Sequence, residues 1–373
     1  MHPLIRAAIV VVLVTGIVGA NAQRLTPIRV IQTLPLTGPQ ASYGQAKADG
    51  AQAYIQKINR QGGVNGRLVE VTTMDDGYDP KRAVENLRKM ASETKPAAVL
   101  GLFGVPVVAA AVPVLDELQI PAVGLTSGAP SLRSPLKKYV LPVRASYADE
   151  APVIVRDMQL LQPRNIAVIY QQNPFGELVR DVFVSALKDA KIGHFATPLT
   201  ANAEIAVNAI ATKDVDAIFL AMLSGPAVQT IKQLRANAAT RSLRLYAPSP
   251  IDTSVLINAL GSDAAGVVVA QIVPDPRSRH MRIASHYQAD MAALGRGSSS
   301  FYGLEAYIEA AVLVEGLRRA GKNASEPASV VAALESFGDT QFDGYPIKFS
   351  ASSRRGSNFV ELTMINRHGG VTR

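Results

Sequence analysis

The chain has 373 residues, of which 48% are hydrophobic and 18% are charged, so it can bury a large core and is not a disordered protein. It contains no cysteine, which excludes disulfide bonds, thiol catalysis and cysteine-ligated metal centres. The formal net charge is +8. The basic residues are scattered, however, without the basic stripe and interleaved aromatic residues of nucleic-acid-binding proteins. We therefore expect no nucleic-acid partner.

The first 22 residues have the pattern of a secretory signal peptide. Arg6 precedes an uncharged apolar stretch that ends in the small-x-small triplet Ala20, Asn21 and Ala22, which is typical of a cleavage site. The apolar part has about 14 residues, whereas a transmembrane helix needs about 20. We predict cleavage after Ala22 and, because no cysteine can carry a lipid, export of the mature chain to the periplasm.

The remaining chain alternates strands and helices in two consecutive series. Apolar runs predict strands, and stripes at i, i+3, i+4 and i+7, such as Ala51, Tyr54, Ile55 and Ile58, predict helices between them. Strands are expected at 28–35, 67–76, 97–104 and 120–125, and again at 165–170, 194–199, 215–221 and 243–249. This alternation predicts an α/β protein with two lobes, each a mostly parallel sheet flanked by helices.

The region after Val273 is predicted to be mainly helical. In the segment 301–322, Leu304 and Ile308 belong to an apolar helix face, and Glu305 and Glu309 lie off that face. Short strands are expected to close the chain at 345–350 and 358–366.

Few residues have the spacing of catalytic or metal-binding sites. The histidines after the signal peptide are scattered, and the segment GLTSG around Ser127 differs from the G-x-S-x-G pattern of serine hydrolases. Asp75, Asp76 and Asp79 form an acidic cluster that would suit a metal ion or an acid–base pair. A strand end followed by a helix N-cap also accounts for these carboxylates, and we favour that structural interpretation. We expect no enzymatic activity, no metal and no cofactor.

Four loops at the expected carboxyl ends of strands are rich in glycine, serine, threonine or proline. They span 35–44, 101–110, 124–132 and 171–177, each directly before a helix. Free backbone N–H groups and hydroxyls at such positions suit a carboxylate ligand. Ordinary strand–helix turns would have the same composition, so both interpretations remain open on spacing alone.

The segment 28–84, with its P-L-T-G, Y-G, G-G-V-N-G and D-D…D-P elements, resembles the opening of the leucine/isoleucine/valine-binding proteins. These are periplasmic substrate-binding components of ABC importers. The similarity extends through 120–132, 165–177 and 298–317 and so covers essentially the whole mature chain. It implies the two-lobed type I periplasmic binding protein fold, with a ligand held between the lobes.

The resemblance also implies a division of the chain. The signal peptide is expected at 1–22, the N-terminal lobe at 26–144 plus 273–345, and the C-terminal lobe at 145–272 plus 346–373. The chain would then cross the hinge three times, near 144–147, 271–274 and 344–347.

Position by position, the resemblance implies a ligand-binding set from both lobes. Tyr43, Phe175, Leu223 and Tyr302 would form walls of the cleft, and the two loops near the ligand carboxylate would supply hydroxyl and backbone groups. The complete expected set is Tyr43, Gly104, Val105, Thr126, Ser127, Gly128, Phe175, Leu223, Ser249 and Tyr302.

Three features differ from the family pattern, the third of which involves two positions. Val105 replaces a serine, Ser249 replaces the acidic residue that holds a ligand ammonium, and Tyr78 and Gly104 replace the two cysteines of a disulfide. The nearest acidic substitute for Ser249 is Asp252. A buried ammonium without an anionic partner is costly, so an aromatic or aliphatic acid without an ammonium group is favoured.

The expected function is therefore a periplasmic solute-binding protein for a small carboxylate, either an amino acid or an aromatic or aliphatic acid. Its partners would be the ligand and an inner-membrane ABC permease, and we expect a monomer. Two alternatives are a periplasmic ligand sensor of similar fold and a hydrolase that uses Ser127.

Overall fold

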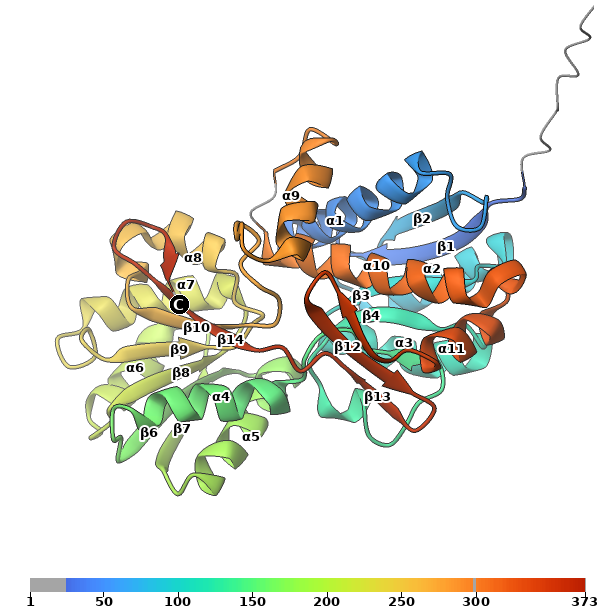
Figure 1. The fold of residues 1–373 in the computed structure, drawn as a ribbon. Coiled ribbons are helices and arrows are strands. Elements are labelled where there is room, and N and C mark those ends of the chain that lie inside the picture. Colours follow the sequence, from blue (N-terminus) through green and yellow to red (C-terminus); the bar gives the residue numbers. More distant parts are fainter. Residues whose placement is uncertain (1–24, 298–299, 373) are drawn as a thin grey trace, which may run out of the picture.

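The computed structural model describes residues 25–297 and 300–372 (Figure 1). The predicted signal peptide and its cleavage site after Ala22 lie outside the described residues. The chain forms two lobes, each built on one sheet with helices on both faces, as the alternation of strands and helices predicted. No helix in the described part is long and apolar enough to cross a membrane.

The first lobe contains a five-stranded parallel sheet with the order β2-β1-β3-β4-β5. Every residue of β3 and β4 is buried, which explains why neither strand contains a charged residue. The strands are β1 (Ile28–Leu34), β2 (Val69–Asp75), β3 (Ala98–Phe103), β4 (Ala122–Thr126) and β5 (Val140–Leu141).

The helices of this lobe come from both ends of the chain. They are α1 (Ala41–Arg60), α2 (Pro80–Thr94), α3 (Val105–Leu118), η1 (Pro130–Leu132), α9 (Arg282–Ala292), α10 (Phe301–Ala320), η3 (Gly321–Asn323) and α11 (Pro327–Glu335). Helices α1 and α10 cross where Gly50 meets Gly303: a Cβ atom on Gly50 would lie 2.0 Å from the Gly303 carbonyl oxygen. The absence of a side chain at Gly50 therefore allows the two helix backbones to touch.

The second lobe has a seven-stranded sheet with the order β15-β14-β10-β9-β8-β6-β7. Its strands from β10 to β7 are parallel, and β14 and β15 add an antiparallel edge. The strands are β6 (Asn165–Gln171), β7 (Gly193–Leu199), β8 (Ala217–Ala221), β9 (Arg244–Ala247), β10 (Val267–Gln271), β14 (Glu361–Ile365) and β15 (Val371–Thr372). The helices are α4 (Tyr147–Gln159), α5 (Pro174–Asp189), α6 (Ala203–Ala211), α7 (Ser224–Ala236), α8 (Thr253–Leu260) and η2 (Gly261–Ala264).

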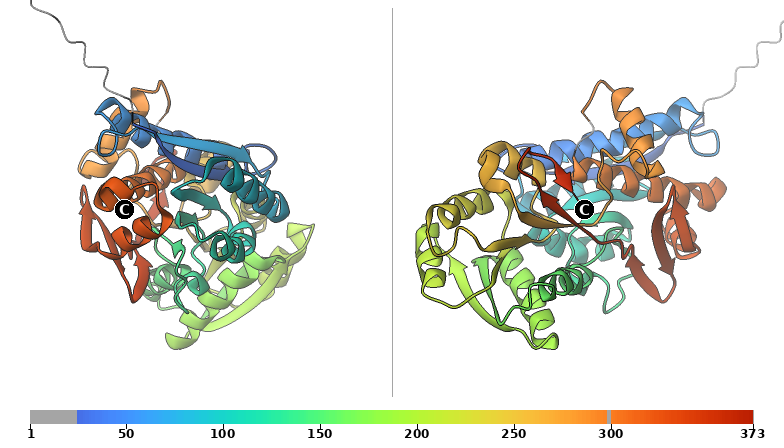
Figure 2. Two further views of the ribbon diagram at one scale, coloured as in Figure 1. Left: turned by 90° about the vertical axis from the view of Figure 1, so that its right-hand side faces the viewer. Right: turned by 60° about the vertical axis from the view of Figure 1, so that its left-hand side comes forward.

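A third, antiparallel sheet of β11 (Gly338–Phe342), β12 (Tyr345–Ser350) and β13 (Ser353–Gly356) belongs to the first lobe (Figures 1 and 2). The buried side chains of Tyr345, Ile347 and Phe349 lie in the same apolar core as Ile28. The chain therefore passes to the second lobe for the last time at 357–360, between β13 and β14, and not near 344–347. Alternation of apolar and polar residues reveals a strand but not the sheet against which it packs.

Candidate functional site

The end of β4 and the loop that follows it carry three of the expected ligand-binding residues. Thr126 is 5% exposed, and its hydroxyl oxygen has no hydrogen-bond partner among the described residues. Ser127 is 1% exposed and accepts a hydrogen bond of 3.3 Å from the backbone N–H of Ala129. A buried hydroxyl without a partner is costly, so an oxygen or nitrogen of a ligand at this loop would be stabilised.

Gly128 brings this loop against the second lobe. Its carbonyl oxygen accepts a hydrogen bond of 2.8 Å from the N–H of Tyr147, the first residue of α4. A Cβ atom at Gly128 would lie 2.5 Å from the Tyr147 ring. Glycine at this position therefore permits the contact between the loop and Tyr147.

An aromatic cluster lies where the first lobe meets the second. The ring centroid of Tyr43 lies 5.7 Å from that of Phe103 and 4.8 Å from that of Tyr302. The Tyr302 hydroxyl donates a hydrogen bond of 2.9 Å to the carbonyl of Pro250 in the second lobe. Burial raises the pKa of Tyr43 to about 12. The phenol is therefore neutral and can donate a hydrogen bond at any physiological pH.

The pair Tyr78 and Gly104 makes a direct contact in place of a disulfide. Gly104 precedes α3 with a φ angle of 89°, and a Cβ atom there would lie 2.3 Å from the Tyr78 ring. The Tyr78 ring also packs edge-on against Phe103, at 5.8 Å between centroids. The Tyr78 ring therefore packs directly on Gly104, at the two positions where the family resemblance implies a disulfide in other members.

Val105, Phe175 and Leu223 contact one apolar cluster of the second lobe. Phe175 is buried and meets Tyr147 edge-to-face, with 6.1 Å between centroids. Val105 and Leu223 are partly buried against the same cluster. Because Val105 belongs to α3 of the first lobe, its side chain makes an apolar contact between the two lobes. The Leu223 N–H donates a hydrogen bond of 2.9 Å to the side chain of Gln171.

Ser249, which the family resemblance includes in the ligand-binding set, is hydrogen-bonded to protein partners in this structure. Its N–H and hydroxyl donate hydrogen bonds of 2.9 Å and 2.7 Å to the Glu150 carboxylate. The Arg144 guanidinium also donates to the Ser249 hydroxyl. An acidic residue therefore does lie beside Ser249, but Arg144 neutralises it at 2.9 Å.

Arg144 and Glu150 belong to a buried charge network that the sequence analysis did not identify. Lys47 is completely buried and lies 3.0 Å from Glu309 and 3.6 Å from Glu305, and Glu305 in turn lies 3.8 Å from Arg144. Burial raises the pKa of Glu309 to about 7, against the opposing charge of Lys47. Glu305 and Glu309 therefore contact buried cations and not water, although they lie off the apolar face of α10.

Two sequence signals could have revealed this network. Lys47 lies four residues before Ala51, on the apolar stripe of α1, and Glu305 and Glu309 are one turn apart in the mainly apolar first part of α10. A charge on a buried face requires a partner of opposite sign.

Asp252 lies in the second lobe and is 7% exposed. One of its carboxylate oxygens accepts hydrogen bonds from the N–H and hydroxyl of Ser254, at 2.8 Å and 2.6 Å, and so caps α8. Its own N–H donates to the Ser224 hydroxyl at 2.9 Å. No lysine or arginine in the described ranges forms an ion pair with Asp252.

The acidic cluster after β2 is structural. Asp75 accepts hydrogen bonds from the backbone of Leu36 and Gly77 and from the hydroxyl of Thr37. Asp79 caps α2. These bonds lower the pKa of Asp75 although burial opposes them. Among residues 25–297 and 300–372, no group of histidines and acids could hold a metal ion.

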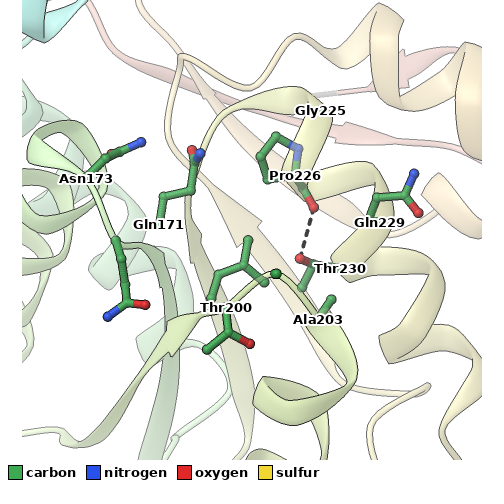
Figure 3. Close-up of a pocket in the computed structure, with 11 residues that line it drawn as sticks. Gln171, Asn173, Thr200, Ala203, Gly225, Pro226, Gln229 and Thr230 are labelled. Carbon is green, nitrogen blue, oxygen red and sulfur yellow. Dashed lines mark hydrogen bonds between the residues drawn. The ribbon is translucent and has the colours of Figure 1, made fainter.

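A cavity of about 490 Å³ opens at the carboxyl ends of β6 and β7 (Figure 3). Its lining is uncharged and includes the polar side chains of Gln171, Asn173, Thr200, Gln229 and Thr230 beside apolar ones. None of the expected ligand-binding residues lines it. Thr230 donates to the Pro226 carbonyl, and Asn173 caps α5. The expected set instead gathers at the loop after β4, at the aromatic cluster and around Tyr147.

Comparison with known proteins supports the resemblance seen in the sequence. The profile of the "Periplasmic binding protein" family matches residues 27–370. The Leu/Ile/Val-binding protein BraC3 of Rhizobium johnstonii is 25% identical over 313 residues, which cover 81% of each chain. A substrate-binding periplasmic protein from Ralstonia solanacearum is 31% identical, with a TM-score of 0.84 over 92% of this chain and 99% of the other. An extracellular ligand-binding receptor from Verminephrobacter eiseniae is 26% identical, with a TM-score of 0.87 over 93% and 100%.

Proposed function

Because the chain belongs to the periplasmic binding protein family, we propose that it binds a small carboxylate between its lobes and delivers it to the permease of an inner-membrane ABC importer. The observation that carries this proposal is the unpaired, buried hydroxyl of Thr126 at the junction of the lobes. A hydroxyl donor at this place has no acceptor until a ligand supplies one.

The surroundings of Thr126 favour an anionic ligand. Helix α3 begins beside this loop, since the Gly104 N–H donates to the Thr126 carbonyl at 3.0 Å, and no side chain caps the helix. Uncapped N–H groups at a helix N-terminus carry partial positive charge and bind anions. Together with the hydroxyls of Thr126 and Ser127, they can hold the two oxygens of a carboxylate.

The ammonium of an amino-acid ligand would need an anionic partner, and the carboxylate that lies beside Ser249 is already paired. Glu150 is paired with Arg144 and hydrogen-bonded by Ser249, and Asp252 uses one oxygen to cap α8. We therefore propose a carboxylate without an ammonium group, although the relative BraC3 is named for leucine, isoleucine and valine.

The role is non-enzymatic in this proposal. Ser127, the residue that a hydrolase would use, accepts a hydrogen bond from Ala129. No histidine of the described chain hydrogen-bonds to Ser127, so a general base for its hydroxyl is lacking.

Calorimetric titration of the purified mature protein tests the proposal. Leucine, valine, benzoate and 3-phenylpropanoate are titrated in one series, and the last two are expected to bind more tightly than either amino acid. Replacement Thr126→Val removes the unpaired hydroxyl without changing the shape of the side chain. It should weaken acid binding about tenfold or more, since a hydrogen bond to a charged group contributes about 1.5–3 kcal/mol.

Thr197→Val, at a similarly buried threonine of β7 in the second lobe, is the matched control and should bind like the parent. If leucine or valine binds most tightly, the proposal that the ligand carries no ammonium group is contradicted. Equal affinities for Thr126→Val and the parent would contradict the position of the carboxylate.

A further inference from the structure

We propose that an apolar slot between α3 and α5, with Lys137 in its wall, takes the apolar body of the ligand and selects acids that carry a ring or an alkyl chain. This inference rests on the proposed function and specifies its ligand. The slot is a cavity of about 360 Å³ lined by Val105, Val108, Ala109, Val112, Ser127, Ala129, Ser131, Leu132, Lys137, Pro174 and Leu178.

The slot continues the carboxylate site. Val105 and Ser127, both expected ligand-binding residues, line the slot as well. A ligand oxygen bound by the Ser127 hydroxyl would therefore lie at one wall of the cavity. The remaining atoms of the ligand would extend over the side chains of Val108 and Val112.

Residues from both lobes line the slot. Most of its lining comes from α3 and the segment 127–137 of the first lobe, whereas Pro174 and Leu178 come from α5 of the second lobe. Leu178 packs against the first lobe's apolar core, beside Val108 and Leu132. An apolar ligand in the slot would therefore be enclosed only when the lobes are together, which couples its burial to closure.

Charge identifies the class of ligand. Lys137 is the one charged residue among those that line the slot. Its ammonium donates hydrogen bonds to the carbonyls of Ser131 and Pro135, at 2.8 Å and 3.3 Å. No carboxylate of the described residues forms an ion pair with it, so its positive charge is compensated only by carbonyl dipoles. An apolar wall with one cation that has no carboxylate partner among the described residues fits an apolar anion.

The volume of the slot limits the length of the anion that it can hold. An apolar cavity of about 150 Å³ admits benzene, so the slot has room for a ring with a short chain or for a medium-length alkyl chain. Short acids such as acetate would leave most of the slot unfilled.

Titration of acetate, butanoate, hexanoate, octanoate and 3-phenylpropanoate against the mature protein tests this inference. Affinity is expected to rise about fourfold per added methylene up to hexanoate or octanoate. Ala109→Phe fills the slot from an exposed position on α3, so it should remove this gain and leave acetate binding unchanged. Circular dichroism establishes that the variant is folded.

Lys137→Met and Lys138→Met form a matched pair, because both remove one positive charge and only Lys137 lines the slot. Lys137→Met should weaken the binding of all acids about tenfold and reduce its dependence on salt, and Lys138→Met should not.

The inference is overturned if the gain with chain length survives in Ala109→Phe, or if the two lysine variants bind alike. Acids that bind to the parent with an affinity independent of chain length would refute the slot and leave the proposed function in place. If no carboxylate binds to the parent, the proposed function fails together with the slot.

Discussion

Replacement of Arg144 by methionine is expected to destabilise the protein by about 3 kcal/mol. Arg144 is 1% exposed and lies 2.9 Å from Glu150 and 3.8 Å from Glu305. Removal of one partner from a buried ion pair typically costs about 3–5 kcal/mol, because the remaining charge is left buried without compensation.

We expect a loss at the lower end of this range of about 3–5 kcal/mol, because Glu150 and Glu305 keep some of their partners when Arg144 is replaced. Glu150 keeps two hydrogen bonds from Ser249, at 2.9 Å and 2.7 Å, and Glu305 keeps Lys47 at 3.6 Å. Each carboxylate therefore retains part of its compensation when the guanidinium is lost.

Urea unfolding followed by far-ultraviolet circular dichroism measures this loss, since the chain contains no tryptophan. The double variant Arg144→Met with Glu150→Gln should recover part of it, because the glutamine carries no charge to leave uncompensated. Arg88→Met, at an exposed pair with Glu117, should scarcely change stability and serves as the control. A loss below about 1 kcal/mol for Arg144→Met, or a double variant as unstable as the sum of the single ones, would refute this reasoning.

Three further predictions concern binding, pH and helix packing. Ser127→Ala should weaken the binding of acids by about 1.5–3 kcal/mol in a calorimetric titration, and equal affinities would remove Ser127 from the site. Burial raises the pKa of Glu309 from 4.5 to about 7. The folded state therefore retains a proton that the unfolded state releases, and the free energy of unfolding should fall by up to about 3 kcal/mol between pH 4.5 and 7. Unfolding titrations of Glu309→Gln should show a smaller fall, and an unchanged pH dependence would contradict this assignment. Gly50→Ala should lower the melting temperature because its Cβ would meet the Gly303 carbonyl at 2.0 Å, whereas Gly225→Ala, with no atom within 4 Å, should not; equal melting temperatures would contradict the close crossing of α1 and α10.

The alternation of strands and helices could be predicted because it depends on neighbouring residues. The buried strands β3 and β4 have mainly apolar sequences without a charge, and Asp79 followed by Pro80 marks the start of α2. The position of β13 could not be predicted in this way. Its pairing with β12 and its place in the first lobe depend on contacts that the local sequence does not encode.

The candidate site was predictable only in part, for the same reason. The family resemblance indicated Thr126 and Tyr43, which lie at the end of β4 and at the start of α1, and the Tyr43 ring packs against Tyr302, which hydrogen-bonds to the second lobe. Ser249 could not be interpreted without Glu150, which lies 99 positions earlier in the chain and binds it. The role proposed for Lys137 could likewise not be predicted, because it depends on the apolar side chains that α3 and α5 contribute to the same slot.

Small-angle X-ray scattering with an acid and its neutral amide tests the central claim, that a carboxylate is bound between the lobes. The radius of gyration should decrease when the protein is saturated with 3-phenylpropanoate, because contacts from both lobes form together only when they close on the ligand. The corresponding amide, 3-phenylpropanamide, has the same apolar body without the charge and should leave the radius unchanged. A radius that stays constant at calorimetrically verified saturation with the acid, or that decreases equally with the amide, would contradict this account.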